Sequence, residues 1–184
     1  MSLVAALRLA ALSALLAALF GCGKDPLSGA MASALLEAVE GAEVVEIVSL
    51  DPEPPEPPVG GGVVPAVKPG PAFHGWPFLD RSAAVSESDR AALLNDLRKM
   101  LRTPSDVAFA CFTPRHAVRL KALGGDLDIV ICFECLNMEI YAVPGGLPTF
   151  VSFRSANEEL WNRVFRRSGI TKQVFPYRPA DSDI

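Results

Sequence analysis

The sequence predicts an α+β fold: an antiparallel β-meander of about five to six strands with two helices packed on one face. Three observations lead to this prediction. Apolar runs flank two glycine pairs, Gly124-Gly125 and Gly145-Gly146, as they do in β-hairpins. One amphipathic helical stripe precedes these hairpins and a second follows them. Strands grouped together, with helices before and after them, are typical of α+β domains.

Length and charge limit the possible classes of protein. The chain has 184 residues and a formal net charge of −4, which fit one small, mildly acidic domain. A nucleic-acid-binding domain needs a basic surface to neutralise phosphates. We therefore expect no nucleic-acid partner.

Residues 1–21 are predicted to be a signal peptide. Leu9–Phe20 is a mostly apolar run without charge. It is shorter than the roughly 20 residues of a membrane span, but it has the length of a signal-peptide core. The following Leu19-Phe20-Gly21-Cys22 resembles the lipobox of bacterial lipoproteins, although its second residue is bulkier than usual. The resemblance implies cleavage before Cys22, lipidation of its sulfur and anchoring in the bacterial cell envelope, outside the cytoplasmic membrane. An ordinary secretory peptide with a coincidental cysteine is the alternative.

The rest of the chain divides into three parts. Residues 22–42 are expected to form a lipidated N-terminus, a tether and a short helix over Ala30–Glu40. Residues 43–170 form a single α+β domain, and residues 171–184 form a C-terminal tail.

The predicted domain begins with a β-branched strand, Glu43–Leu50. A Pro/Gly-rich insertion at 51–72 follows and predicts a mobile, polyproline-like loop. A further strand is predicted at Val107–Phe112.

Two helices are predicted from their apolar stripes and their caps. The first spans Ser86–Leu101, with Ser86 as the N-cap and Asp89 at the capping-box position. The second spans Ser155–Ser168, with Ser155 as the N-cap and Glu158 at the capping-box position, and Gly169 follows directly after its end.

The hairpins predict which side chains share a face. Pairing outward from Gly124-Gly125 places Lys121 opposite Asp128, with apolar pairs on the other face. The same procedure at Gly145-Gly146 places Ile140 opposite Val151. Between the two hairpins the core-facing positions change from odd to even numbers, so we expect a bulge or bend between Phe133 and Leu136.

Cys111, His116, Cys132 and Cys135 are candidate disulfide or metal-binding residues, spaced C-x4-H-x15-C-x2-C. Zinc needs four ligands that converge on one point. The predicted faces argue against this, because His116 is on the core side and Cys132 on the other. A thiol-redox site at Cys132 and Cys135 is a second possibility, but the motif lies between strands and lacks the helix N-terminus that activates such thiols. A disulfide from Cys111 to one of the pair, or buried thiols, is the third.

Three further residues are candidates for binding. His74 and Trp76 belong to an aromatic turn, Phe73-His74-Gly75-Trp76-Pro77, which we expect to close one end of the core. Arg115, at the start of a strand, could bind an anion. Packing and ordinary hydrogen bonding are the alternatives for all three. Because the sequence contains no recognisable catalytic constellation, no catalytic residue and no cofactor are predicted.

Three sequence blocks, Phe73-His74-Gly75-Trp76-Pro77, Cys111-Phe112-x-Pro114-Arg115-His116 and Ile131-Cys132-Phe133-Glu134-Cys135, together resemble a family of small uncharacterised bacterial proteins. The family carries FHGYP, CFxPRH and ICFEC blocks in this order and is often exported. Trp76 here replaces the family's tyrosine. The resemblance supports the domain boundaries and implies no mechanism.

The sequence therefore predicts a lipid-anchored envelope protein whose domain is a non-catalytic binding or interaction module. Its partners would be the membrane, through the lipid, and an unknown protein or small molecule. The alternative is a zinc-binding or thiol-redox domain centred on the three cysteines of the domain.

Overall fold

The computed structural model describes residues 29–52, 72–107, 111–122, 125–143 and 147–172. This part of the chain contains three helices and a seven-stranded antiparallel sheet. The predicted signal peptide with Cys22, most of the Pro/Gly-rich insertion and most of the tail lie outside the described residues. The predicted α+β class is confirmed, but the sheet is larger than the five to six strands predicted.

The strand order is β2-β3-β1-β4-β5-β6-β7. Strands β4 to β7 form the predicted meander. Strand β1 lies between β3 and β4 and is antiparallel to both, so the chain passes from β3 to β4 through a helix and not through a hairpin. The strands are β1 (Glu43–Leu50), β2 (Ala72–Phe73), β3 (Trp76–Ser82), β4 (His116–Ala122), β5 (Gly125–Cys132), β6 (Asn137–Val143) and β7 (Thr149–Ser152).

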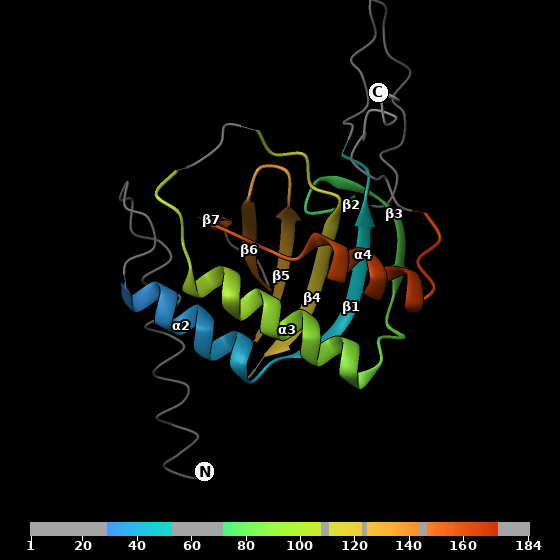
Figure 1. Ribbon diagram of the computed structural model, residues 1–184, viewed down its shortest axis with the longest axis horizontal. Helices are drawn as coiled ribbons and strands as arrows, with labels where there is room; N and C mark the ends of the chain where they lie inside the picture. Colours follow the sequence, from blue (N-terminus) through green and yellow to red (C-terminus); the bar gives the residue numbers. More distant parts are fainter. Residues whose placement is uncertain (1–28, 53–71, 108–110, 123–124, 144–146, 173–184) are drawn as a thin grey trace, which may run out of the picture.

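Helices α2 (Gly29–Glu40), α3 (Glu87–Arg102) and α4 (Glu158–Arg167) lie across one face of the sheet (Figure 1). The main core fills the space between this face and the helices. Leu35 and Val39 of α2 are buried in that core, so the short helix packs with the domain. No helix in the described part of the chain is long and apolar enough to cross a membrane.

The caps of the two longer predicted helices are partly as expected. Ser86 caps α3, and its hydroxyl accepts a hydrogen bond from the Asp89 N–H, as predicted. Helix α4 begins three residues later than predicted, and its N-cap is Asn157 and not Ser155. Two long-range hydrogen bonds hold the residues before the helix: the Arg154 N–H donates to Thr103 O, and the Asn157 N–H donates to Asp96 Oδ2. Gly169 follows the end of α4 with a positive φ of 85°, as predicted.

The predicted pairings are each wrong by two residues. Gly125 pairs with Ala122, and Asp128 therefore lies opposite Arg119, where Lys121 was predicted. Val151 likewise pairs with Met138, where Ile140 was predicted. A shift of two residues leaves every side chain on the same face. The predicted faces are thus right, while the predicted partners are wrong.

Two other local predictions have different outcomes. The chain bends between Phe133 and Leu136, as predicted, but it does so in a hairpin turn, Phe133–Leu136, flanked by the pair Cys132 and Asn137, and not in a bulge. The strand predicted at Val107–Phe112 is absent from the described residues of that range. Strands β2 and β3, by contrast, were not predicted, because β3 shows no alternation of burial and contains a proline, Pro77.

His116 lies on the helix side of the sheet, within an aromatic cluster formed by Phe133, Trp161 and Phe165. Its Nε2 lies 2.8 Å from Asn162 Oδ1, which acts as the acceptor. Burial lowers the pKa of His116 to about 4, although the hydrogen bond to Asn162 opposes this shift. The imidazole is therefore neutral at pH 7.

This burial predicts a loss of stability in weak acid. The unfolded state binds a proton near pH 6.5, whereas the folded state does so only near pH 4, so stability falls as the pH falls through this window. We expect a loss of roughly 2 kcal/mol in the free energy of unfolding between pH 6.5 and 4.5, since each pKa unit corresponds to about 1.4 kcal/mol. Urea unfolding at a series of pH values measures it.

His116→Gln should flatten the pH profile in this window. A slope equal to that of the unmodified protein would assign the acid sensitivity to other groups.

Candidate functional site

The face of the sheet opposite the helices is here called the outer face. It carries a row of polar side chains that contact one another. The hairpin of β2 and β3 curls over it (Figure 1). His74 and Gly75 form the two-residue turn of this hairpin, and both have positive φ, 51° and 90°. Two such residues are the signature of a type I′ hairpin turn. Histidine is among the residues that tolerate this conformation better than most.

The turn places His74 against a buried carboxylate. His74 Nε2 lies 2.7 Å from Asp128 Oδ2, and the Asp128 side chain is only 1% exposed. Arg119 binds the same carboxylate with two hydrogen bonds, from Nε to Oδ1 at 2.7 Å and from Nη2 to Oδ2 at 2.8 Å. These contacts with Asp128 are the main reason that the pKa of Arg119 is raised. A buried charge needs such partners, because leaving it unpaired is costly.

These residues belong to one row that crosses the sheet. In the strand register Glu46 lies opposite Arg119, Arg119 opposite Asp128, and Asp128 opposite Tyr141. The His74 ring stacks on the Tyr141 ring, with centroids 3.7 Å apart. Burial and the hydrogen bond to Glu139 raise the pKa of the Tyr141 hydroxyl, which stays protonated and donates to that carboxylate at 2.7 Å. Arg119 therefore lies between two carboxylates of this row, those of Glu46 and Asp128.

A second feature of the outer face is a chain of aromatic rings. Trp76 contacts Phe112 at a centroid distance of 5.7 Å, and Phe112 contacts Phe150 at 5.8 Å. Phe150 is 47% exposed, whereas Trp76 and Phe112 are partly buried against a small apolar cluster. The rings extend from β3 to β7, and Phe112 lies between them.

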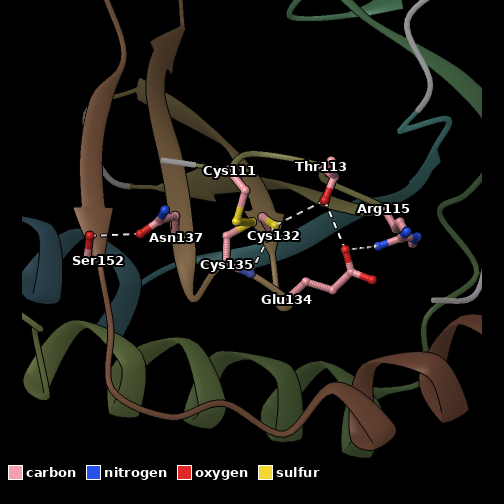
Figure 2. Close-up of a disulfide and its surroundings, with 8 residues drawn as sticks. All are labelled: Cys111, Thr113, Arg115, Cys132, Glu134, Cys135, Asn137 and Ser152. Atoms are coloured by element: carbon pink, nitrogen blue, oxygen red, sulfur yellow. Dashed lines mark hydrogen bonds and ion pairs between the residues drawn. A yellow bond between two sulfur atoms is a disulfide. The ribbon is translucent and has the colours of Figure 1, made fainter. Parts of the chain in front are cut away.

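The cysteines lie at one end of the outer face, where β5 meets its turn (Figure 2). Cys111 and Cys135 form a disulfide, one of the pairings considered from the sequence. Cys132 is a buried free thiol, and its Sγ accepts a hydrogen bond from the Cys135 N–H at 3.3 Å. The sequence did not decide which member of the CxxC pair Cys111 would join.

A hydroxyl group lies beside the thiol and links it to a carboxylate. Thr113 Oγ1 lies 3.8 Å from Cys132 Sγ and donates to Glu134 Oε2 at 3.0 Å. Arg115 Nη1 lies 2.9 Å from the same Glu134 oxygen. Burial alone would raise the pKa of Glu134, but the hydrogen bonds from Arg115 and Thr113 outweigh it and hold the pKa below its usual value. Arg115, predicted as an anion-binding residue, thus binds an anion of its own chain.

The structure separates the four residues considered for zinc. His116 is on the helix side of the sheet with Asn162, while Cys111, Cys132 and Cys135 are on the outer face. Two of the cysteines are consumed by the disulfide. Among the described residues, no group of three or more His, Cys, Asp or Glu side chains is placed to hold a metal ion.

Sequence reasoning found His74, Trp76 and the cysteines but missed several of their partners. A register wrong by two residues hides the cross-strand neighbours, and it paired Asp128 with Lys121 in place of Arg119. A correct register would have revealed the pair of Arg119 and Asp128. The missed residues are Glu46, Phe112, Thr113, Arg119, Asp128, Tyr141 and Phe150.

No family model, curated protein or solved structure matches this chain. The family resemblance drawn from the three sequence blocks therefore remains a hypothesis.

The buried pair of Arg119 and Asp128 gives a prediction for stability. Arg119→Met removes two charge-assisted hydrogen bonds from the buried carboxylate, so the free energy of unfolding should fall by about 2–3 kcal/mol. Adding Asp128→Asn removes the unpaired charge and should recover at least half of that loss. Urea unfolding at pH 8 measures both.

Arg81→Met is the matched control. Arg81 is an arginine of the same surface, but its side chain is 61% exposed and its contact with Glu46 is 3.6 Å long. Its loss should cost less than about 0.5 kcal/mol. If Arg119→Met were equally mild, Asp128 would not depend on Arg119.

Proposed function

We propose that this protein is a lipid-anchored protein of the bacterial cell envelope, and that its α+β domain is a non-catalytic module that binds a protein partner through the outer face. The anchoring part rests on the likeness of Leu19-Phe20-Gly21-Cys22 to a lipobox. The binding part rests on one observation, the partly exposed chain of aromatic rings that ends at Phe150.

Aromatic rings in this setting favour a protein partner. Tyrosine, tryptophan, phenylalanine and arginine are enriched in the buried centres of protein interfaces, and tryptophan, tyrosine and arginine supply many of their strongest contacts. The outer face presents Trp76, Phe112 and Phe150 beside Tyr141 and Arg119. A half-exposed phenylalanine at the end of the ring chain offers apolar area that a partner can cover.

The polar row beside the rings supports the same proposal. Its carboxylates are matched by arginines, since Glu46 lies near both Arg81 and Arg119, and Arg119 binds Asp128. A surface compensated in this way does not attract a highly charged ligand over a long distance. It suits a partner held by apolar contact and a few directed hydrogen bonds.

The metal-binding alternative lacks support in the described part of the chain, because its four candidate ligands lie on two sides of the sheet. The thiol alternative is supported by a different observation, the free thiol of Cys132 beside the disulfide of Cys111 and Cys135. This site lies at the end of the outer face next to the turn Phe133–Leu136 and does not involve the aromatic rings.

The binding proposal predicts site-specific crosslinking in cells. With the photoreactive residue p-benzoylphenylalanine in place of Phe150, illumination should yield a discrete protein adduct detectable on a denaturing gel. The same residue at Asn95, exposed on α3 on the opposite side of the molecule, is the matched control and should yield no such adduct.

The yield of the adduct should also depend on the chain of aromatic rings. Combining the reporter at position 150 with Trp76→Ala should lower its yield at least fivefold, because Trp76 supports Phe112. Equal adducts from positions 150 and 95, or none from position 150, would contradict a protein partner at this face.

The anchoring proposal predicts that Cys22→Ser releases the protein from membranes. A single acyl chain binds membranes only marginally, and stable attachment needs more than one. Losing the acylated cysteine should move the protein from the detergent phase to the aqueous phase in Triton X-114 partitioning. Cys132→Ser is the control for a cysteine change elsewhere and should stay in the detergent phase. Unchanged partitioning of Cys22→Ser would refute the anchor.

A further inference from the structure

The three cysteines of the outer face have the geometry of a disulfide that can move. Cys132 directly precedes the turn Phe133–Leu136, and Cys135 lies within it, three residues after Cys132. Ends of such a turn lie within about 7 Å between Cα atoms, which overlaps the span of about 4.4–6.8 Å that a disulfide bridges. The Cys135 N–H already donates to Cys132 Sγ at 3.3 Å, so the free thiol lies against the residue whose own sulfur is bonded to Cys111 (Figure 2).

A route exists for the proton of the buried thiol. Thr113 has a single hydroxyl proton and donates it to Glu134 Oε2 at 3.0 Å. In its 3.8 Å contact with Cys132 Sγ, the Thr113 oxygen must therefore accept, and the thiol donates. The Glu134 side chain is 38% exposed and reaches water. The chain from Cys132 through Thr113 to Glu134 thus joins a buried S–H group to the solvent.

The negative charge of Glu134, which lies between the two cysteines in the sequence, is compensated. Arg115 binds its carboxylate at 2.9 Å. A negative charge next to a thiol disfavours its thiolate form. The ion pair between Arg115 and Glu134 weakens this effect.

Exposure differs between the sulfur-bearing residues. Cys132 and Cys135 are each 1% exposed, whereas Cys111 is exposed. A reagent in solution therefore reaches Cys111 and not the other two.

We propose that these residues form an intramolecular thiol–disulfide exchange site. The thiolate of Cys132 attacks Sγ of Cys135, a bond forms between these two sulfurs, and the bond between Cys111 and Cys135 breaks. The electron pair of the broken bond passes to Cys111 Sγ, which takes up a proton in exchange for the one lost from Cys132. One disulfide and one thiol exist before and after, so the step needs no oxidant or reductant. Its result is a free thiol at Cys111 on the surface, able to attack a disulfide of a partner molecule.

The experiment is thiol mapping under native conditions. The full chain, purified in detergent without reductant, is exposed to N-ethylmaleimide between pH 6 and 9, quenched in acid and digested. We expect the adduct on Cys111, together with a peptide that contains the Cys132–Cys135 disulfide. Oxidised glutathione in place of the maleimide should give a mixed disulfide at Cys111.

Two variants at the attacking residue test the mechanism. Cys132→Ser and Cys132→Ala should each lower the rate of labelling at Cys111 at least tenfold, because no internal thiol can displace it. Circular dichroism shows whether each variant folds, and the alanine variant covers the case in which a buried serine does not.

A third variant tests the proton route. Thr113→Val removes the hydroxyl and should slow labelling several-fold while Cys111 remains the labelled residue. Lys99→Met, exposed on α3 on the other side of the sheet, should leave the rate unchanged.

Three results would overturn the proposal: an adduct on Cys132 alone, no adduct on any cysteine of the folded domain, or a rate at Cys111 that does not change when Cys132 is replaced. Each would leave Cys111–Cys135 as a fixed crosslink. None of them bears on the crosslinking expected at Phe150, so the exchange site and the binding proposal fail independently.

Discussion

The outer face of this domain depends on one buried carboxylate. Asp128 lies in the middle of the sheet with 1% of its side chain exposed, and it is bound by Arg119 and by His74. Burying a charge is tolerable only when such partners are present. The requirement has a structural consequence, because His74 belongs to a different hairpin, 54 residues earlier in the chain. Satisfying Asp128 therefore holds the β2–β3 hairpin over the sheet, and with it Trp76 and the start of the aromatic ring chain.

The sheet also separates two kinds of chemistry. On the helix side, His116 is held neutral among aromatic rings and bonded to Asn162, which suits a packing role. On the other side, Cys132 lies beside a disulfide, and a hydroxyl and a carboxylate connect it with solvent. Neighbouring residues in the motif Cys111-Phe112-Thr113-Pro114-Arg115-His116 thus serve different faces. The spacing of the cysteines and the histidine resembles that of a zinc site, but the fold places these residues on two opposite faces of the sheet.

The sequence was sufficient to predict the faces but not the partners. Alternation of apolar and polar residues determines which side of a strand is buried, and a two-residue error in pairing does not change that. The same error replaced Arg119 by Lys121 as the neighbour of Asp128 and so hid the central ion pair. Strand β3 escaped detection because its residues are half-buried throughout, without the period of two that marks a strand. The cap of α4 was misplaced because long-range hydrogen bonds, from Arg154 to Thr103 and from Asn157 to Asp96, hold the residues before the helix, and spacing in the sequence does not reveal them. The disulfide partner of Cys111 could not be chosen from spacing, since the choice depends on how the turn after β5 orients Cys132 and Cys135.

The disulfide and the aromatic rings are not independent features. Phe112, the middle ring of the chain from Trp76 to Phe150, directly follows Cys111 in the sequence. The disulfide is a covalent contact of the segment that contains Cys111 and Phe112. It fixes the backbone from which Phe112 reaches the outer face. An exchange that transfers the bond from Cys111 to Cys132 would leave Phe112 held by its ring contacts and by packing against the small apolar cluster, without the covalent link. The two proposals therefore meet at this segment: the pairing of the cysteines sets how firmly the central ring of the binding face is held.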